Sequence, residues 1–386
     1  MLFRSEGIAV HFDENTEYLE YLLSETKKEE VLVIHTPAVP IDHKEYVWLM
    51  ANGYTIKKRS IVLGEITRSF KTIAIAGTHG KTTTSTLVAH ILKSAGLNCY
   101  AFLGGISANY NTNLLLGTES SEKETYVVVE ADEYDRSFLT LHPFVTIITS
   151  CDPDHLDIYG GKQQIQQAYT DFAHQTQADG FLLVKNSVNN TLALKNKRLV
   201  YSVISGTESN PTDFSAKNIQ VRGDSFYFDF DSINCSLKNL HLGIPGDHNV
   251  ENAVAAIAVC LLIGLSSYEI STAVSTFKGV RRRFDYRIKN QNVIYIDDYA
   301  HHPEELNAFI NAVKKLYPGK KIHGIFQPHL YTRTRDFADE FAKSLDLLDD
   351  CTLLPIYPAR EIPIPGVSSE RSEEHTSELQ SHSFIS

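Results

Sequence analysis

The sequence is poor in cysteine, has no long apolar run and carries fewer basic than acidic residues. Its five cysteines are scattered and never spaced as CxxC, which excludes a disulfide framework and a cysteine-ligated zinc site. This usage is typical of a reducing compartment, so we expect a cytoplasmic protein. The longest apolar run, residues 253–265, has 13 residues, whereas a membrane-spanning helix needs about 20. The net charge of −11 argues against a protein that coats nucleic acid or an anionic membrane.

A length of 386 residues with 42% hydrophobic residues is typical of a globular protein of about two or three domains. Short apolar runs alternate with helical patterns, which predicts an α/β fold with a parallel, doubly wound sheet. We expect a partial N-terminal α/β domain over 6–70, a central domain over 71–280 and a C-terminal α/β domain over 281–370. The ends, 1–5 and 371–386, resemble a translated sequencing adapter and are expected to lie outside the fold; a natural disordered tail is the alternative.

Several segments predict particular secondary structure. Residues 72–76 form an apolar run typical of a buried strand. From Thr82 onward apolar side chains repeat at helical spacing, and Gly96 is the expected C-cap. Three phenylalanines between residues 226 and 230 alternate with other side chains, which predicts antiparallel strands. Further helices are expected over 163–178, 249–264 and 267–276, from Pro303, and from about 334.

The turn between the strand at 72–76 and the helix after it has the composition of a phosphate-binding loop. Small residues let backbone N–H groups approach phosphate oxygens, and the start of a helix adds a positive dipole end. Lys81 is placed to reach β- and γ-phosphates, and the Thr82 hydroxyl to ligate Mg²⁺. Ile75 stands where GxxxxGK[ST] has its first glycine, so a glycine-rich turn before a helix remains the alternative. The predicted nucleoside triphosphate loop comprises Gly77, Thr78, His79, Gly80, Lys81, Thr82 and Thr83.

Carboxylates follow two further strands of the expected sheet. The apolar run 126–129 is followed by EADE, which begins with Glu130, and the run 145–149 is followed by SCDPDH, which ends with His155. Ligands of doubly wound sheets bind outside the carboxyl ends of the strands, and Mg²⁺ takes hard oxygen ligands. We therefore expect both segments to face the phosphate loop, with a second metal or a polarised substrate site near His155. Loop residues that bind nothing are the alternative.

Other polar clusters also stand at the ends of expected elements. Asn249 and Asn252 lie where a buried helix begins, and an amide there is often only an N-cap, a strong alternative for Asn249. The run 281–283 is either a solvated basic run or a phosphate clamp. Two adjacent histidines, 301 and 302, point apart, which argues against one shared ion. The residues that follow two later strands, and that suit carboxylate or phosphate recognition, are Asp298, Tyr299, His301, His329 and Arg333.

Seven ordered strings resemble the Mur ligase family over about residues 6–370: GTHGKTTT, EADEYD, DPDHLD, PGDHNVENA, GVRRRFD, DDYAHHPEE and FQPHLYTRTRD. The resemblance implies an N-terminal UDP-sugar domain, a central ATPase and a Rossmann-like C-terminal domain. It also implies ATP, Mg²⁺ and a ligation in which a carboxylate is phosphorylated and an amine then displaces phosphate.

The strings DPDHLD and RRRFD favour the branch that adds L-alanine to the lactyl carboxylate of UDP-N-acetylmuramate in peptidoglycan precursor synthesis. A ligase that recycles murein tripeptide onto the same sugar remains an alternative, as does another P-loop amide ligase or a kinase.

The resemblance implies roles for individual residues. Lys81, Glu130 and His155 would be catalytic, with Thr82, Glu130 and His155 as metal ligands. The nucleotide would also be bound by Asn249, Asn252, Arg283 and Asp298. The amino acid and the sugar would be bound by Tyr299, His301, His329 and Arg333. Leu330 departs from the family pattern, in which many members carry arginine.

The ends of the resemblance give a further expectation. The first half of the N-terminal domain, with its uridine-diphosphate loop, is not recognisable, and the resemblance to the C-terminal domain stops at Glu370. We therefore expect residues 6–370 alone to be weakly active or inactive. A binding-only protein is one more alternative, against which the intact Lys81, Glu130 and His155 speak.

Overall fold

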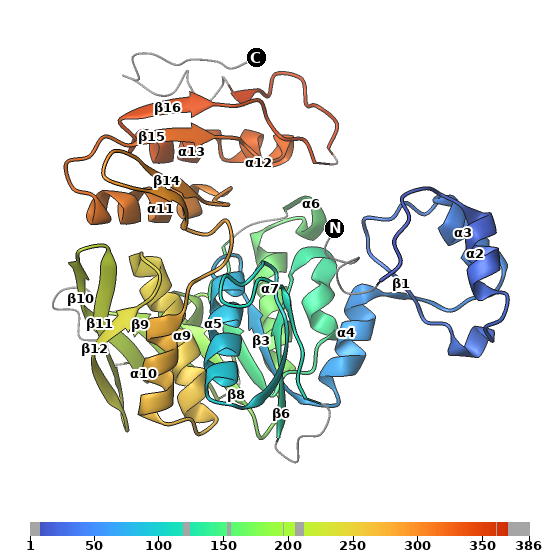
Figure 1. Cartoon of the computed structure of the whole chain (residues 1–386), viewed down its shortest axis with the longest axis horizontal. Coiled ribbons are helices and arrows are strands. Elements are labelled where there is room, and N and C mark those ends of the chain that lie inside the picture. The colour runs from blue at the N-terminus through green and yellow to red at the C-terminus, as the bar shows by residue number, and fades with distance from the viewer. Residues whose placement is uncertain are drawn as a thin grey trace. The chain divides into compact units, whose positions relative to one another are not determined.

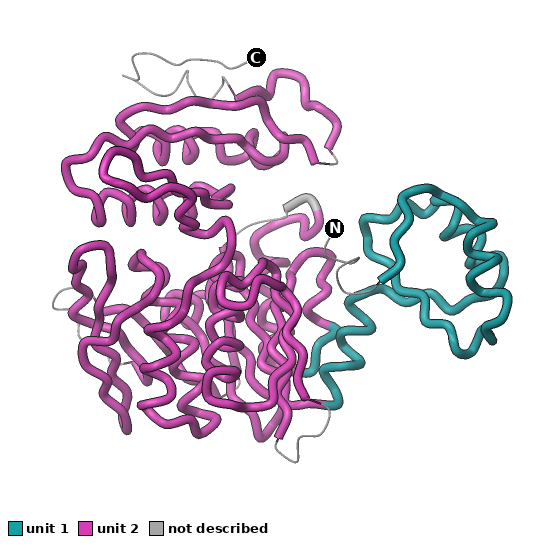
Figure 2. The backbone as a smooth tube through the Cα atoms, viewed as in Figure 1, with its two compact units in different colours: residues 1–69, 140–142 teal, residues 70–139, 143–386 magenta. Residues whose placement is uncertain are grey.

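The computed structural model describes residues 8–118, 124–152, 156–195, 197–204, 212–359 and 361–369. The chain divides into two compact units, shown in Figure 2. The first comprises residues up to 69 together with 140–142, and the second comprises 70–139 and the residues from 143 onward. The expected adapter-like ends and His155 lie outside the described residues.

The first unit is a small α/β structure. Strands β1 (Val33–His35) and β2 (Ile56–Lys58) pair in parallel, with Val33 opposite Ile56. The remaining elements are α2 (Thr16–Leu23), a 3₁₀ helix (Lys28–Glu30), α3 (Lys44–Ala51) and α4 (Arg59–Thr67).

A ten-stranded sheet organises the second unit, in the order β12-β11-β10-β9-β8-β7-β3-β6-β4-β5. The seven strands from β10 to β4 pair in parallel, and antiparallel strands extend both edges. The strands are β3 (Lys71–Ala76), β4 (Asn98–Phe102), β5 (Leu114–Leu115), β6 (Thr125–Glu130), β7 (Val145–Ile148), β8 (Phe181–Lys185), β9 (Leu199–Val203), β10 (Phe214–Arg222), β11 (Ser225–Ser232) and β12 (Ser236–Leu242).

Helices cover this sheet and bury β3 on both faces. Thr72 to Ala76 are all buried, as expected for a central parallel strand. Ile73 and Ile75 contribute to the main apolar cluster, which also contains residues of α5 (Lys81–Ser94), α9 (Asp247–Leu262) and α10 (Ser267–Thr276) (Figure 1). The other helices here are a 3₁₀ helix (Tyr134–Thr140), α6 (Leu156–Tyr159), α7 (Lys162–His174) and α8 (Asn186–Asn189).

Helix α5 begins and ends close to the predicted residues. It begins at Lys81, one residue before the expected start. At its other end Gly96 adopts φ +70° directly after the C-cap Ala95, and the Leu97 N–H donates to the Leu92 carbonyl at 3.0 Å. This is the Schellman arrangement, which satisfies the last carbonyls of a helix and favours glycine because of the positive φ.

The predicted antiparallel strands are confirmed. Strand β11 pairs antiparallel with β10 and with β12. Phe226, Phe228 and Phe230 are buried, and the residues between them are partly exposed. The alternation found in the sequence is therefore that of a sheet with one face on the core.

The segment after residue 284 has a smaller apolar cluster of its own. Strands β13 (Asp285–Lys289) and β14 (Ile294–Asp297) pair antiparallel, and β15 (His323–Phe326) and β16 (Asp350–Leu353) pair in parallel. Leu306 and Ile310 of α11 (Pro303–Leu316) pack with Phe326 and Phe341. The helices that follow β15 are α12 (Tyr331–Asp336) and α13 (Ala338–Leu345).

One helix prediction in this segment was wrong in detail. The helix expected from about residue 334 is two helices, because Phe337 has φ −124° and ψ 24° and ends α12 before it begins α13. Neither glycine nor proline occurs between residues 331 and 345, so no local sequence signal marks this interruption.

The predicted fold class is confirmed: a multi-domain α/β protein with a large, mostly parallel central sheet. Within the described residues no helix is long and apolar enough to cross a membrane. The domain boundary expected at residue 281 stays a prediction.

The burial of β11 gives a test of this architecture. Phe228 is 1% exposed, and Phe228→Ala should lower the free energy of unfolding by about 3–5 kcal/mol because it leaves a cavity in the core. Ile233→Ala is the matched control, since Ile233 is 93% exposed just after the same strand, and it should change the free energy by less than about 0.5 kcal/mol. Urea unfolding followed by circular dichroism measures both values, and equal losses would contradict the described burial.

Candidate nucleotide and ligation site

The phosphate loop joins β3 to α5 at the carboxyl edge of the sheet. Gly80 precedes α5 with φ +85°, and a Cβ there would lie 2.5 Å from Asn252 Oδ1. Gly77 has φ +137°, and a Cβ there would overlap the Thr149 hydroxyl. Both glycines are therefore required by backbone conformation and by space. Without side chains at these positions, the loop leaves the start of α5 open to an anion.

The sheet order places two polar strand ends beside this loop. Strand β3 pairs with β6 on one side and with β7 on the other. Glu130 is the last residue of β6, and Ser150 follows β7. The Ser150 hydroxyl accepts a hydrogen bond from the backbone N–H of His79 at 2.7 Å. The loop thus lies between the two segments that the sequence analysis selected.

Lys81 is held by a buried carboxylate. Its Nζ lies 2.8 Å from both carboxylate oxygens of Glu133 and donates to the Gly77 carbonyl at 2.6 Å. Burial by itself lowers the pKa of Lys81, but the charges of Glu133 and Glu130 outweigh this effect and raise the pKa. Lys81 is therefore protonated, and its charge is paired with that of Glu133. Sequence reasoning gave Glu133 no role, although it lies in the same acidic segment as Glu130.

Thr82, Glu130 and Arg283 meet at the start of α5. The Thr82 hydroxyl donates to Glu130 Oε1 at 3.0 Å, and Gly104 N–H donates to the other carboxylate oxygen at 3.0 Å. Arg283 Nη2 donates to Thr82 Oγ1 at 3.2 Å. The hydroxyl and the carboxylate are hard oxygen ligands, so this pair fits Mg²⁺ that is also held by phosphate oxygens and water.

The predicted second metal site involves a residue that the structure does not describe. His155 lies outside the described residues, so its pairing with Glu130 stays a prediction. Among the residues that the structure describes, no group of three His, Cys, Asp or Glu side chains is arranged to hold a metal ion.

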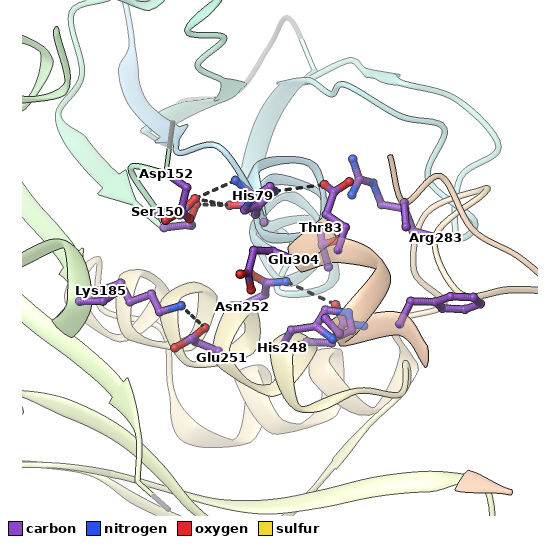
Figure 3. A pocket seen from close by; sticks show the side chains of 18 of the residues that line it. His79, Thr83, Ser150, Asp152, Lys185, His248, Glu251, Asn252, Arg283 and Glu304 are labelled. Atoms are coloured by element: carbon purple, nitrogen blue, oxygen red, sulfur yellow. Dashed lines mark hydrogen bonds and ion pairs between the residues drawn. The ribbon is translucent and has the colours of Figure 1, made fainter. Parts of the chain in front are cut away.

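A cavity of about 430 Å³ opens beside the phosphate loop (Figure 3). Its lining combines the loop with the ends of β7 and β8, the start of α9 and the start of α11. At one end of it Lys185 and Glu251 form an ion pair of 2.8 Å. The predicted nucleotide residues that line it are His79, Gly80, Thr83, Asn249, Asn252, Arg283 and Asp298. The remaining predicted nucleotide residues, Gly77, Thr78, Lys81 and Thr82, belong to the adjoining loop and to the first turn of α5.

The two asparagines lie in the first turns of α9, not at its N-cap. The helix begins at Asp247, and its N-cap is Gly246, so the N-cap alternative for Asn249 was wrong. Asn249 Nδ2 donates to the Pro245 carbonyl at 2.5 Å, and Asn252 Nδ2 donates to Asn249 Oδ1 at 3.3 Å. Asn252 also accepts from the Thr84 hydroxyl at 3.3 Å, which ties the start of α9 to α5.

Asp298 connects the Arg283 segment to the end of β14. Its carboxylate accepts from the Phe284 N–H at 2.7 Å and from the Ala300 N–H at 2.8 Å. Burial raises the pKa of Asp298 to about 6, although these backbone donors and Arg283 favour the charged form. The Asp298 carboxyl is therefore mostly charged at pH 7 and becomes protonated as the pH falls through about 6.

The four residues predicted to bind the amino acid and the sugar form one cluster. The rings of Tyr299 and His301 have centroids 4.9 Å apart, and those of His301 and His329 are 6.0 Å apart. Arg333 Nη1 lies 3.4 Å from His329 Nδ1. Leu330 precedes α12 with φ +72°, a strained value for a branched residue, and its N–H donates to the Tyr357 carbonyl at 3.0 Å.

A cationic phosphate loop, an acidic strand end beside it and a pocket that reaches a second α/β segment define an ATP-dependent ligase that forms carbon–nitrogen bonds. Within this class, the chain belongs to the Mur ligase family. Residues 75–260 match the Mur ligase middle domain, and residues 282–383 match the Mur ligase, glutamate ligase domain.

Named relatives and solved structures agree with this assignment. The UDP-N-acetylmuramate–L-alanine ligase of Parabacteroides distasonis is 47% identical over 370 residues, which are 95% of this chain and 77% of the relative. The crystal structure of the UDP-N-acetylmuramate–alanine ligase of Thermotoga maritima is similar with a TM-score of 0.75 and 25% identity, over 99% of this chain and 86% of that one. A murein peptide ligase from Psychrobacter arcticus shares the fold, with a TM-score of 0.69 and 24% identity, over 97% of this chain and 80% of that one.

The pocket residue His248 gives a pH-dependent prediction. Burial, together with the charge of Arg283, lowers the pKa of His248 from an ordinary value of 6.5 to about 4 against the opposing charges of Asp247 and Glu305. The unfolded chain therefore binds a proton below pH 6.5 that the folded chain refuses until about pH 4. The free energy of unfolding therefore decreases as the pH falls from 6.5 to about 4, because protonation of His248 favours the unfolded chain.

We expect His248 to lower the free energy of unfolding by about 2 kcal/mol when the pH is changed from 7 to 5. His248→Gln should remove that part of the pH dependence in urea unfolding curves at the two pH values. His241→Gln, which changes a histidine of β12 outside the pocket, is the control. An unchanged pH dependence in His248→Gln would contradict the buried neutral imidazole.

Proposed function

We propose that this protein joins L-alanine to the lactyl carboxylate of UDP-N-acetylmuramate at the expense of ATP, in the cytoplasmic synthesis of peptidoglycan precursors. The observation that carries the proposal is the loop of Lys81 between two polar strand ends, beside a pocket that reaches the loop of Asp298 and Tyr299. The relatives that are about 47% identical are named for this reaction, which supports the same substrates here.

The first step brings a carboxylate against a polyphosphate. The lactyl carboxylate oxygen attacks the γ-phosphorus of ATP, the bond to the β,γ-bridging oxygen breaks, and an acyl phosphate and ADP result. Both reactants are anions, so cationic groups must offset their repulsion. Lys81 would serve the β- and γ-phosphates after leaving Glu133, and Arg283 would add a second positive charge near Thr82.

Mg²⁺ would be held by Thr82 and Glu130, and when bound it would neutralise charge on the phosphate oxygens. Glu130 is kept in place for this role by the Gly104 N–H. The proposed second ion, shared between Glu130 and His155, rests on the sequence resemblance alone.

The second step forms the amide. The neutral amine of L-alanine attacks the acyl carbon, a tetrahedral intermediate forms, and inorganic phosphate leaves as the amine gives up its proton. Arg333 and the imidazoles of His301 and His329 would bind the carboxylate of the amino acid and the adjoining sugar, since cationic and N–H-bearing side chains suit these groups. The sum is one amide, ADP, phosphate and a proton for each ATP consumed.

A substrate-omission experiment tests the proposal. Phosphate release by the full-length protein is measured with ATP, Mg²⁺, UDP-N-acetylmuramate and L-alanine, each left out in turn. Release that needs all four supports the proposal, and release without an amino acid indicates a kinase. Preference for the tripeptide L-alanyl-γ-D-glutamyl-meso-diaminopimelate over L-alanine would favour the recycling ligase, and no dependence on UDP-N-acetylmuramate would contradict both ligases.

Lys81→Ala should reduce kcat by a factor of about 10³ or more, because the variant lacks the charge that offsets the developing phosphate charge. Steady-state phosphate release measures the effect. Lys93→Ala, which changes the lysine in the last turn of the same helix, should stay within about twofold of the unsubstituted rate. A Lys81→Ala rate near the unsubstituted value would contradict the role of Lys81.

Glu130→Gln should raise the Mg²⁺ concentration needed for half-maximal activity by about tenfold or more, since a carboxylate ligand becomes a neutral amide. A magnesium titration at saturating nucleotide measures it. Glu124→Gln changes a carboxylate at the opposite end of the same strand and is the control. An unchanged magnesium requirement in Glu130→Gln would show that the metal is held elsewhere.

A further inference from the structure

Glu305 connects two parts of the site that the sequence analysis treated separately. It lies in the first turn of α11, where the N-cap is His302. Glu305 Oε2 accepts a hydrogen bond from the His301 backbone N–H at 3.0 Å and lies 3.3 Å from His301 Nδ1. The other oxygen, Oε1, lies 3.3 Å from Nδ1 of His79 in the phosphate loop.

This geometry exceeds what a helix start requires. A glutamate three residues after an N-cap usually reaches back to the N-cap N–H and so satisfies the helix end. Here one oxygen reaches one residue farther, to His301, and the second oxygen is directed at a residue 226 positions earlier in the chain. A role confined to the helix start would leave the contact with His79 unexplained.

The electrostatic setting keeps Glu305 charged. Its side chain is 17% exposed, and burial alone raises the pKa of its carboxyl. The hydrogen bond with His79 and the charges of His301 and Arg283 outweigh burial, so the pKa is lowered well below its usual range. A charged carboxylate accepts strong hydrogen bonds at both oxygens, and it holds both partners in place.

The two histidines that Glu305 contacts belong to different parts of the site. His79 lies in the phosphate loop, and His301 lies in the cluster predicted to bind the amino acid and the sugar. The His79 backbone N–H donates to the Ser150 hydroxyl, so the ring that Glu305 contacts belongs to the loop beside the end of β7. The His301 ring faces His329, which contacts Arg333. One carboxylate therefore contacts both the phosphate loop and the loop that carries Tyr299 and His301.

We propose that Glu305 is a positioning residue that couples occupancy of the phosphate loop to the geometry of the amino-acid side of the site. Nucleotide binding fixes His79, and Glu305 then fixes the His301 loop. This proposal rests on the proposed function for the identity of the second substrate. The contacts of Glu305 themselves do not depend on that identity.

The test uses the full chain with Glu305→Gln, which keeps one acceptor oxygen for the His301 N–H but loses the charge and the second acceptor. Glu340→Gln, which neutralises an exposed carboxylate on α13, is the control. Amide hydrogen exchange of residues 299–302 is measured with and without a non-hydrolysable ATP analogue and Mg²⁺. In the unsubstituted chain and in Glu340→Gln, the analogue should slow exchange of this segment.

In Glu305→Gln the analogue should still bind, within about threefold, but its protection of 299–302 should fall by about tenfold because a charged hydrogen bond is lost. Glu305→Asp, which keeps the charge on a shorter side chain, should give a protection between those of Glu305→Gln and the unsubstituted chain. If Glu305→Gln does not fold, full protection in Glu305→Asp would overturn the proposal. Full nucleotide-dependent protection in Glu305→Gln would overturn the proposal.

Steady-state kinetics provide a second measurement, which distinguishes the positioning role of Glu305 from the proposed ligase function. Glu305→Gln should raise the KM for L-alanine by about tenfold, while hydroxylamine, which traps the acyl phosphate as a hydroxamate, should react at a rate within about threefold of the unsubstituted one. Equal losses in both assays would indicate a merely structural role and count against positioning. Failure of the unsubstituted full-length protein to use L-alanine would contradict the proposed function, and the exchange measurement would still decide the role of Glu305.

Discussion

The position of β3 between β6 and β7 is the constraint on which the site depends. Parallel strands end at the same edge of a sheet, so the loop after β3 must lie between the residues that follow its two neighbours. Glu130 and Ser150 come from those neighbours, and both contact the loop or the first turn of α5. A different strand order would leave the same residues in the sequence without bringing them to one anion site.

Charges in this site are held in place by other charges of the chain. Lys81 is paired with Glu133, and the carboxylate of Glu305 lies between His79 and His301. Such pairs are costly to bury, and they are held by several hydrogen bonds each. In the proposed reaction these pairs would preorganise the site: when a triphosphate enters, Lys81 would only change partners, with little reorganisation. The site therefore has its electrostatic arrangement before either anionic reactant arrives.

Some parts of this arrangement were predictable because they depend on local pattern. The phosphate loop was identified from a strand, two glycines and a helix start, and β11 from alternating phenylalanines, since such signals lie within a few residues. Glu133 and Glu305 were not singled out. Glu133 is one carboxylate among several in its segment, and Glu305 resembles an ordinary acidic residue of a first helical turn, so their partners are defined only by packing.

The sequence by itself determined the elements and the chemistry available at their ends, because backbone conformation and side-chain type act over short distances. It specified a loop that only glycine at 77 and 80 can form, and strands that end in carboxylates and hydroxyls. The tertiary structure decided which of these ends meet. The pairing of Lys81 with Glu133 and the contact of His79 with Glu305 depend on strand order and helix packing, which join residues 52 and 226 positions apart.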